Sequence, residues 1–249
     1  MKLPDGDLVA HVNSGETGML YRDIFIENCY LRHGIELSAG DVVLDVGANI
    51  GMATMYFHRQ APGITVHGFE PAPEPFEALE WNMERHRIQG AAHRVALSDK
   101  PGIAEFVYYP RTTVMSGLHA DASADSKLTR DFLHNSGFDD EDIEEMLDGK
   151  YAADVIQTQI STLSEQIAEL GIETIGLLKL DVEKSELDVL RGLDERDWPR
   201  IRQMVMEVHG AEGRLERITT MLEDRGFRTV VVQDELLEGT QIFELFAVR

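Results

Sequence analysis

The residues best suited to bind a ligand follow the first clear strand of the chain. Residues 42–46 are Val-Val-Leu-Asp-Val, which is typical of a buried strand, and a turn of small residues and a helix follow. In open α/β sheets ligands bind at the carboxyl ends of the strands, which is where Asp45 lies. Gly47 permits a positive φ and close approach of the backbone to a ligand, and Gly51 lets the helix pack tightly. The candidate binding residues are Asp45, Gly47, Ala48, Asn49 and Gly51.

The spacing of this turn argues against a dinucleotide. That fingerprint needs Gly-x-Gly-x-x-Gly, but Asn49 and Met52 stand at the second and third glycine positions. The carboxylate of Asp45 would also repel a pyrophosphate. It favours a cationic ligand instead, and S-adenosylmethionine offers an α-amino group and a sulfonium. A purely structural turn between strand and helix is the alternative.

Two further strand ends extend this candidate cofactor site. Glu70 ends the second expected strand, 25 residues after Asp45, where an acid can accept hydrogen bonds from both ribose hydroxyls. Ser98 and Asp99 follow the third expected strand, residues 92–97, where an adenine edge should lie. A simple turn before Pro101 explains Ser98 and Asp99 equally well.

A second group of polar residues lies later in the chain. Asp181 and Glu183 follow one buried strand, and Glu207 and His209 end the next, so each pair shares a face by its i, i+2 spacing. Neighbouring parallel strands end at the same edge, so these four side chains predict a site. A divalent metal such as Mg²⁺ or Mn²⁺ would suit three carboxylates and an imidazole, and a buried ion pair is the structural alternative.

The residue types suggest roles in proton transfer. His209 is the first candidate for a general base, since its ordinary pKa lies near neutral pH. Glu207 is expected to orient it, and Asp181 to position the acceptor beside the cofactor. His119, in a long polar loop, is the rival base. Glu186 is expected to be an exposed helix acid with a local role.

One more charge interrupts a buried strand. Lys179 precedes Asp181 by two residues, and a buried ammonium destabilises the fold unless it is paired or used. The sequence does not identify its partner.

Strands and helices alternate along most of the chain, which favours a mostly parallel sheet covered on both faces. The loop between the last two strands is too short for a parallel crossover, so this pair should be antiparallel. The expected strands are 42–46, 64–69, 92–97, 102–109, 155–160, 175–180, 201–208, 227–233 and 241–248. The expected helices are 17–31, 51–60, 73–87, 126–134, 139–147, 162–170, 184–193 and 212–225. We expect one α/β domain, 1–249, with an N-terminal helical cap (1–34) and a helical insertion or lid (112–150).

Composition narrows the function classes. The 249 residues carry 23 Lys and Arg against 45 Asp and Glu, a net charge of −22, which argues against a uniformly basic nucleic-acid surface. The single cysteine, Cys29, excludes a disulfide framework and a cysteine zinc site. No apolar run is long enough to span a bilayer and no signal-peptide core is visible. These features predict a soluble, cytoplasmic protein that binds neither nucleic acid nor membrane.

Taken in order, five motifs resemble the FkbM family of S-adenosylmethionine-dependent methyltransferases. They are the Asp45–Gly51 turn, Phe69-Glu70-Pro71, Ala96-Leu97-Ser98-Asp99, Leu177–Glu183 and Met206–His209. The likeness covers roughly residues 15–249 and extends to the FkbM-type domains of polyketide and nonribosomal peptide synthetase pathways. It implies a class I methyltransferase fold, with a Rossmann-like, mostly parallel sheet and an antiparallel last strand.

The resemblance also implies O-methylation of a hydroxyl or carboxylate of a natural-product intermediate, free or bound to a carrier protein. N-methylation and a non-catalytic, cofactor-binding scaffold are the alternatives. The family often has glycine where this chain has Lys184, so its substrate preference does not transfer directly. Acidic carrier proteins would be repelled by the net charge unless a local basic patch exists. The candidates for such a patch are Arg85, Arg87, Arg94 and Arg111.

Overall fold

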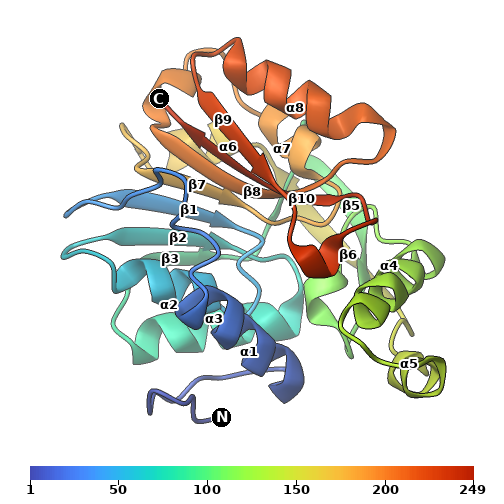
Figure 1. Ribbon diagram of the computed structural model, residues 1–249. Helices are drawn as coiled ribbons and strands as arrows, with labels where there is room; N and C mark the ends of the chain where they lie inside the picture. Colours follow the sequence, from blue (N-terminus) through green and yellow to red (C-terminus); the bar gives the residue numbers. More distant parts are fainter.

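The computed structural model describes residues 1–249 and is built around a seven-stranded sheet (Figure 1). The strand order is β3 (Gln89–His93), β2 (Thr65–Phe69), β1 (Val42–Val46), β7 (Leu177–Leu180), β8 (Gln203–His209), β10 (Ile242–Val248) and β9 (Arg228–Val232). The first five strands are parallel, and β10 runs antiparallel to both β8 and β9. The expected antiparallel hairpin at the end of the chain is confirmed.

Helices cover both faces of this sheet. Figure 1 shows α1 (Ser14–Tyr21), α2 (Met52–His58) and α3 (Pro73–Arg85) below it and α6 (Leu163–Glu169), α7 (Glu186–Arg191) and α8 (Arg214–Glu223) above it. Successive strand residues point to opposite faces. Val43 and Val205 accordingly pack in the core that includes α2 and α3, while Leu44 and Met204 pack in the core that includes α6, α7 and α8.

A second, three-stranded sheet corrects one predicted strand. Residues 92–97 do not form one strand: β3 ends at His93, and β4 (Ala96–Leu97) pairs with β6 (Asp154–Ser161) in the second sheet, whose other edge is β5 (Gly102–Tyr108). The N–H of Val95 donates to the carbonyl of His93, so the chain turns between the two strands. Because β6 offers a free edge that only tertiary structure creates, this change of sheet was not predictable from local sequence.

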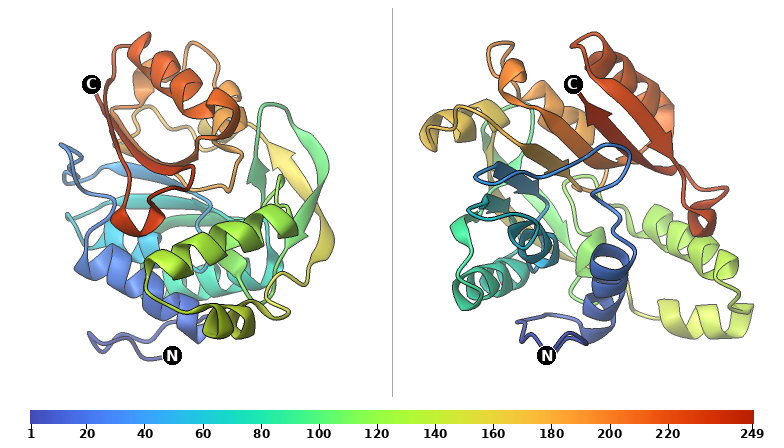
Figure 2. Two further views of the ribbon diagram at one scale, coloured as in Figure 1. Left: turned by 45° about the vertical axis from the view of Figure 1, so that its right-hand side comes forward. Right: turned by 60° about the vertical axis from the view of Figure 1, so that its left-hand side comes forward.

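The insertion contains the two predicted helices. They are α4 (Ala122–Asn135) and α5 (Asp140–Leu147), and they pack on each other through a small core of Leu133, Ile143 and Leu147. The first begins four residues earlier than predicted because the side chain of Asp121 caps it, accepting the N–H of Ala124. In Figure 2 both helices lie to one side of the main sheet.

The N-terminal helix is shorter than the predicted 17–31. Asn13 caps it, so that α1 begins at Ser14, and a π-helical turn, Arg22–Ile26, ends it. Asn28 then adopts a positive φ of 53° and accepts the hydroxyl of Tyr56, which directs the chain back toward the sheet. The other predicted helices and strands are present with ends moved by a few residues. Short 3₁₀ turns lie at Thr113–Met115, Trp198–Arg200, Ala211–Gly213 and Glu235–Leu237.

None of the helices combines the length and the apolar character that crossing a membrane would require.

Candidate active site

The buried carboxylate of Asp45 has a cationic partner within the chain. Strands β1 and β7 are neighbours with Asp45 opposite Lys179, and the two charged groups lie 3.0 Å apart (Oδ1 to Nζ). The other carboxylate oxygen accepts the hydroxyl of Thr54 at 2.6 Å. From the strand pattern alone we expect Asp45 to bind a cationic ligand. In the structure the ammonium of Lys179 takes that position beside Asp45. The partner that Lys179 required is therefore Asp45.

Lys179 has further partners at the same strand ends. Its Nζ donates to the carbonyl of Gly47 at 2.7 Å and lies 3.6 Å from Oδ2 of Asp181. Burial disfavours the ammonium, but the carboxylates of Asp45 and Asp181 outweigh burial and raise the pKa of Lys179. Lys179 is therefore protonated at neutral pH, and its ammonium links the glycine turn to the end of β7.

The two glycines of the turn serve different contacts. Gly47 has a φ of 75°, and a Cβ there would collide with the backbone carbonyl oxygen of Asp181. Gly51 has a φ of 86°, and a Cβ there would lie 2.7 Å from Cδ1 of Leu79 in α3. The close approach that glycine permits is therefore made to the protein's own backbone and to a neighbouring helix.

Glu70 joins the turn as the sequence predicts. Its two oxygens accept the backbone N–H groups of Asn49 (2.9 Å) and Ala72 (2.8 Å). Burial raises the pKa of Glu70 to about 7. Each carboxylate oxygen can accept a second hydrogen bond. The buried acid therefore keeps capacity for a pair of ligand hydroxyls.

Ser98 and Asp99 lie outside this arrangement. Ser98 follows β4 in the second sheet, where its N–H donates to the carbonyl of Ser161, and Asp99 is exposed beside Lys100. No contact joins either residue to Asp45 or Glu70. Their predicted contact with adenine depended on a continuous strand 92–97, which the turn at Val95 interrupts.

A cluster of carboxylates surrounds His209 at the ends of β7 and β8. Its Nε2 lies 3.2 Å from Glu183 and 3.9 Å from Glu207, and its Nδ1 lies 3.1 Å from Glu186. Glu186 is fully buried, so the expectation of an exposed helix acid is wrong. The first turn of α7 packs onto the end of β8, which the spacing of residues along either element could not reveal.

The charges of this cluster determine which groups can exchange a proton. Burial opposes a charged imidazole, but Glu183 and Glu186 outweigh it and hold the pKa of His209 well above its usual range. The resting imidazole is therefore protonated at neutral pH, with a carboxylate facing each ring nitrogen. Burial and the charges of Asp181 and Glu183 raise the pKa of Glu207 well above its usual range. With 35% of its side chain exposed, Glu207 is the accessible acid of the cluster.

Asp181 lies between the two groups. Its N–H donates to the carbonyl of Val46, and its carboxylate contacts Lys179 and accepts the hydroxyl of Tyr30 at 3.3 Å. Tyr30 was not identified as a site residue from the sequence, where it lies near the end of the expected helix 17–31. The segment after α1 thus reaches the edge of the sheet.

The predicted metal site is compatible with the geometry. Three of its four predicted ligands, Glu183, Glu207 and His209, have ligand atoms within 4.8 Å of one another, and Asp181 is not part of this group. Glu183 Oε2 and His209 Nε2 are buried without a well-formed hydrogen bond between them. Oxygen and imidazole ligands suit Mg²⁺ or Mn²⁺, provided that His209 first loses its proton.

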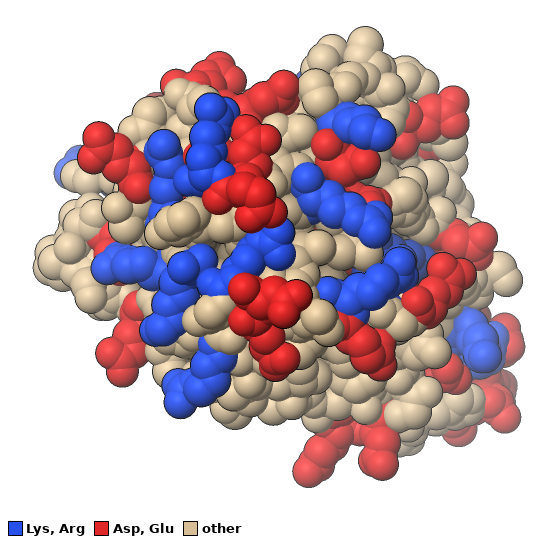
Figure 3. All heavy atoms as spheres, turned by 90° about the horizontal axis from the view of Figure 1, so that it is seen from above, with Lys and Arg blue, Asp and Glu red and all other residues tan.

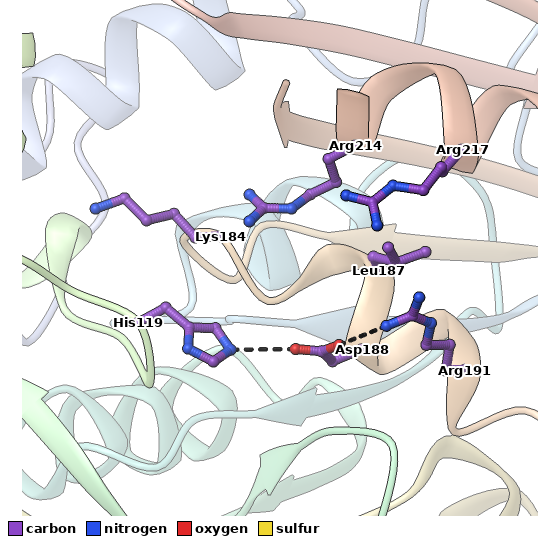
Figure 4. Close-up of a pocket in the computed structure, with 7 residues that line it drawn as sticks. All are labelled: His119, Lys184, Leu187, Asp188, Arg191, Arg214 and Arg217. Carbon is purple, nitrogen blue, oxygen red and sulfur yellow. Dashed lines mark hydrogen bonds and ion pairs between the residues drawn. The ribbon is translucent and has the colours of Figure 1, made fainter. Parts of the chain in front are cut away.

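His119 is not among these groups. Its Nε2 lies 3.1 Å from Oδ2 of Asp188, and half of its side chain is exposed. Figure 4 shows it at one end of a separate small pocket beside α7. No contact brings His119 to Asp181 or Glu207.

Comparison with known proteins adds independent information. Residues 45–229 match the family model described as the methyltransferase FkbM domain. The 31-O-demethyl-FK506 methyltransferase FkbM of Streptomyces tacrolimicus is 50% identical over 250 residues, which cover all of this chain and 96% of that protein. The AMB antimetabolite synthetase AmbE of Pseudomonas aeruginosa is 38% identical over 260 residues, which cover 99% of this chain and 12% of the synthetase.

Solved structures share the fold at low identity. A methyltransferase FkbM from Methylobacillus flagellatus KT has a TM-score of 0.53 at 11% identity, over 86% of this chain and 45% of that one. A fibrillarin from Aeropyrum pernix with natively bound S-adenosyl-L-methionine has a TM-score of 0.50 at 16% identity, over 92% of this chain and 76% of that one. At such identities the likeness concerns the fold alone.

Proposed function

Since this chain belongs to the FkbM family of methyltransferases, we propose that it methylates a hydroxyl group of a natural-product intermediate. The chain has the class I methyltransferase fold and is an S-adenosylmethionine-dependent methyltransferase. The choice of oxygen as acceptor is supported by the Streptomyces relative, whose name makes 31-O-demethyl-FK506 its substrate.

The observation that carries the proposal is the accessible acid beside the cofactor half of the site. Asp181 contacts Lys179, which is paired with Asp45, and Asp181 is also one of the charges that raise the pKa of Glu207. In its ionised form, a carboxylate with a raised pKa is a stronger base than an ordinary one, and next to a site for a methyl donor it can accept the proton of a hydroxyl acceptor.

The cofactor half fits S-adenosylmethionine through residues of the chain itself. Glu70 would accept the ribose hydroxyls, and the turn that follows Asp45, with Asp181, would hold the amino-acid part, while Asp45 would position this turn through Lys179 and Thr54. When bound, S-adenosylmethionine supplies an already activated methyl group, so alignment is the main task of the protein. Ser98 and Asp99 stay a prediction for the adenine end, one that would require the segment after β4 to approach the ligand.

We assign the proton to Glu207 rather than to His209. With S-adenosylmethionine bound, its methyl group would be transferred from sulfur to the hydroxyl oxygen, and Glu207 would accept the hydroxyl proton. His209, protonated and held by Glu183 and Glu186, keeps the carboxylates in place. This reverses the roles expected from the sequence, because both nitrogens of His209 already face carboxylates. Asp181 positions the acceptor.

The test is methyl transfer from labelled S-adenosylmethionine to candidate hydroxyl acceptors, with their O-methyl derivatives as controls. We expect label in an O-methyl product and a loss of turnover in Asp181→Asn and Glu207→Gln. Unchanged turnover in both variants would show that the catalytic assignment is wrong. Transfer to an amine instead of a hydroxyl would replace O-methylation with N-methylation.

Two further outcomes separate the alternatives. Tight binding of S-adenosylhomocysteine without turnover on any acceptor, free or carrier-bound, favours a non-catalytic binding domain. Full activity after dialysis against a chelator contradicts a required metal at Glu183, Glu207 and His209. Activity that is lost and then restored by Mg²⁺ or Mn²⁺ supports it.

A further inference from the structure

A small cationic pocket lies beside the candidate active site. It has a volume of about 210 Å³. Its lining residues are His119, Lys184, Leu187, Asp188, Arg191, Arg214 and Arg217. Four of these seven carry a positive charge and one a negative charge, in a chain whose net charge is −22. Figure 3 shows the surrounding face, above α7 and α8, where Lys and Arg side chains gather with acids between them.

The one carboxylate of the pocket is already neutralised. Asp188 lies 3.1 Å from His119 and 3.4 Å from Arg191. Arg217 has no acidic partner, since its guanidinium donates only to the backbone carbonyls of Gly213 and Glu212. Figure 4 shows the guanidinium groups of Arg191, Arg214 and Arg217 arranged around Leu187. Lys184 and Arg214 also lie near acids outside the pocket, Asp125 and Glu186, so the charge of Arg217 is the one left without an acidic partner, and the arginines supply several N–H donors.

Lys184 has a backbone conformation that is unfavourable for lysine. It has a φ of 73°, a left-handed conformation that glycine adopts freely and lysine does not. Its ammonium pairs with the buried Asp125 of α4 and lies at the rim of the pocket. Compared with glycine, lysine at this position adds a positive charge between the pocket and the helical insertion.

The pocket is connected to the catalytic cluster. Arg214 donates to the carbonyl of His209 at 2.8 Å and lies 3.7 Å from Glu186. The N–H of Lys184 donates to the same Glu186 at 2.8 Å. A group held in the pocket would therefore lie beside Glu186, which contacts His209, and His209 in turn lies 3.9 Å from Glu207.

Size and charge together indicate the ligand. Pockets for whole small molecules usually measure about 300–1,000 Å³, so this one suits a single charged group of a larger molecule. Guanidinium groups bind tetrahedral oxyanions through several N–H donors at once. We propose that this pocket binds a phosphate or phosphodiester group carried by the methyl acceptor. The inference rests on the proposed function, because it places that group on the acceptor.

Two sources share this chemistry. One is the phosphodiester of a phosphopantetheine arm that tethers an acceptor to a carrier protein. The other is a phosphate ester on a free acceptor. A local cationic pocket would let this otherwise acidic protein bind either kind of phosphate group. The basic patch considered from the sequence, at Arg85, Arg87, Arg94 and Arg111, shares no residue with this pocket.

The experiment is titration calorimetry of the full chain with 4′-phosphopantetheine, pantetheine, inorganic phosphate and acetate. We expect phosphopantetheine to bind at least about tenfold more tightly than pantetheine, and phosphate more tightly than acetate, as charge-assisted hydrogen bonds imply. Phosphopantetheine binding more tightly than phosphate favours the carrier tether, and equal binding favours a free phosphate ester. No binding of either phosphate compound overturns the proposal.

Variants locate the binding. Arg217→Gln and Arg191→Gln should each weaken phosphate binding by about tenfold or more, while the matched control Arg196→Gln, an exposed arginine outside the pocket, should not. Equal weakening in the control would overturn the assignment to this pocket. S-adenosylhomocysteine binding is measured in the same samples. If S-adenosylhomocysteine binds but phosphate does not, only the proposed phosphate pocket is rejected. If S-adenosylhomocysteine does not bind either, the proposed function is rejected.

Discussion

The two halves of the site balance their charges differently. On the cofactor side, the buried Asp45 is matched by Lys179 and the hydroxyl of Thr54. On the acceptor side, His209 faces Glu183, Glu186 and Glu207, so that one cation meets three acids. The first arrangement is complete without a ligand. The second has more acids than its one cation can neutralise, and the pKa values of Glu183 and Glu207 are raised as a result of burial and of this crowding.

This difference suggests different tasks. A paired and buried group is rigid, which suits a surface that must hold a cofactor in one orientation. An acid whose pKa is raised by its neighbours binds a proton more tightly than an ordinary carboxylate, which suits proton transfer once the acid is ionised. The predictions below test whether each half behaves in this way.

The largest effect is expected from Lys179→Met, because it leaves the buried Asp45 without its cation. Breaking a buried ion pair in this way should lower the free energy of unfolding by about 3–5 kcal/mol, measured by urea denaturation. The double variant Asp45→Asn, Lys179→Met removes both charges and should recover much of that loss. A loss below about 1 kcal/mol in the single variant would mean that the pair does not hold this half together.

On the acceptor side, Glu207→Gln should reduce kcat by about a hundredfold or more, because the hydroxyl proton loses its acceptor. The free energy of unfolding should change little, since Glu207 is partly exposed. Glu244→Gln is the matched control: Glu244 lies directly opposite Glu207 on β10 and contacts Arg32. Equal kcat values for the two variants would contradict the assignment of the proton to Glu207.

Glu70 is the exception on the cofactor side, since it lacks a cationic partner within hydrogen-bond distance. Its pKa is about 7 in the folded protein, against about 4.5 when unfolded, so the protonated form favours folding. The stability that Glu70 contributes is complete below pH 4.5 and is lost as the pH rises through 7.

Glu70→Gln removes this titration. The free energy of unfolding of the variant, relative to that of the unmodified protein, should therefore increase by about 1–3 kcal/mol between pH 5 and pH 8. Parallel stability curves over this range, measured without cofactor, would show that Glu70 is not held at a raised pKa.

The smallest expected effect is on the stability of variants at Lys184, in the segment that follows β7 between the two halves of the site. Lys184→Gly and Lys184→Ala remove the same ammonium, but only glycine adopts a φ of 73° without strain. We expect the glycine variant to be more stable by about 1 kcal/mol in urea denaturation. An alanine variant as stable as the glycine variant would show that the backbone relaxes at this position.

Much of the site could be predicted from strand ends. Asp45, Glu70, Glu207 and His209 each end a run of buried apolar residues, and such a run also identifies the strand. Because parallel strands end at one edge, the predicted strands placed these residues near one another. The antiparallel hairpin followed from the length of its loop.

Contacts between distant segments could not be predicted in this way. The burial of Glu186, the hydroxyl of Tyr30 on Asp181 and the cationic pocket each depend on elements that meet only in the folded protein. The turn at Val95 depends on the free edge of β6, where Ala96 pairs with Ile160, 64 residues further along the chain.

The sequence by itself determined the alternation of strands and helices and the types of residue at the strand ends, because hydrophobic periodicity and turn chemistry are local properties. Only the tertiary structure decided which charges neutralise one another. It paired Asp45 with Lys179 and enclosed His209 among carboxylates, and so determined the protonation state of each group. Those states depend on burial and on distances of a few ångströms between side chains, which the order of residues along the chain does not specify.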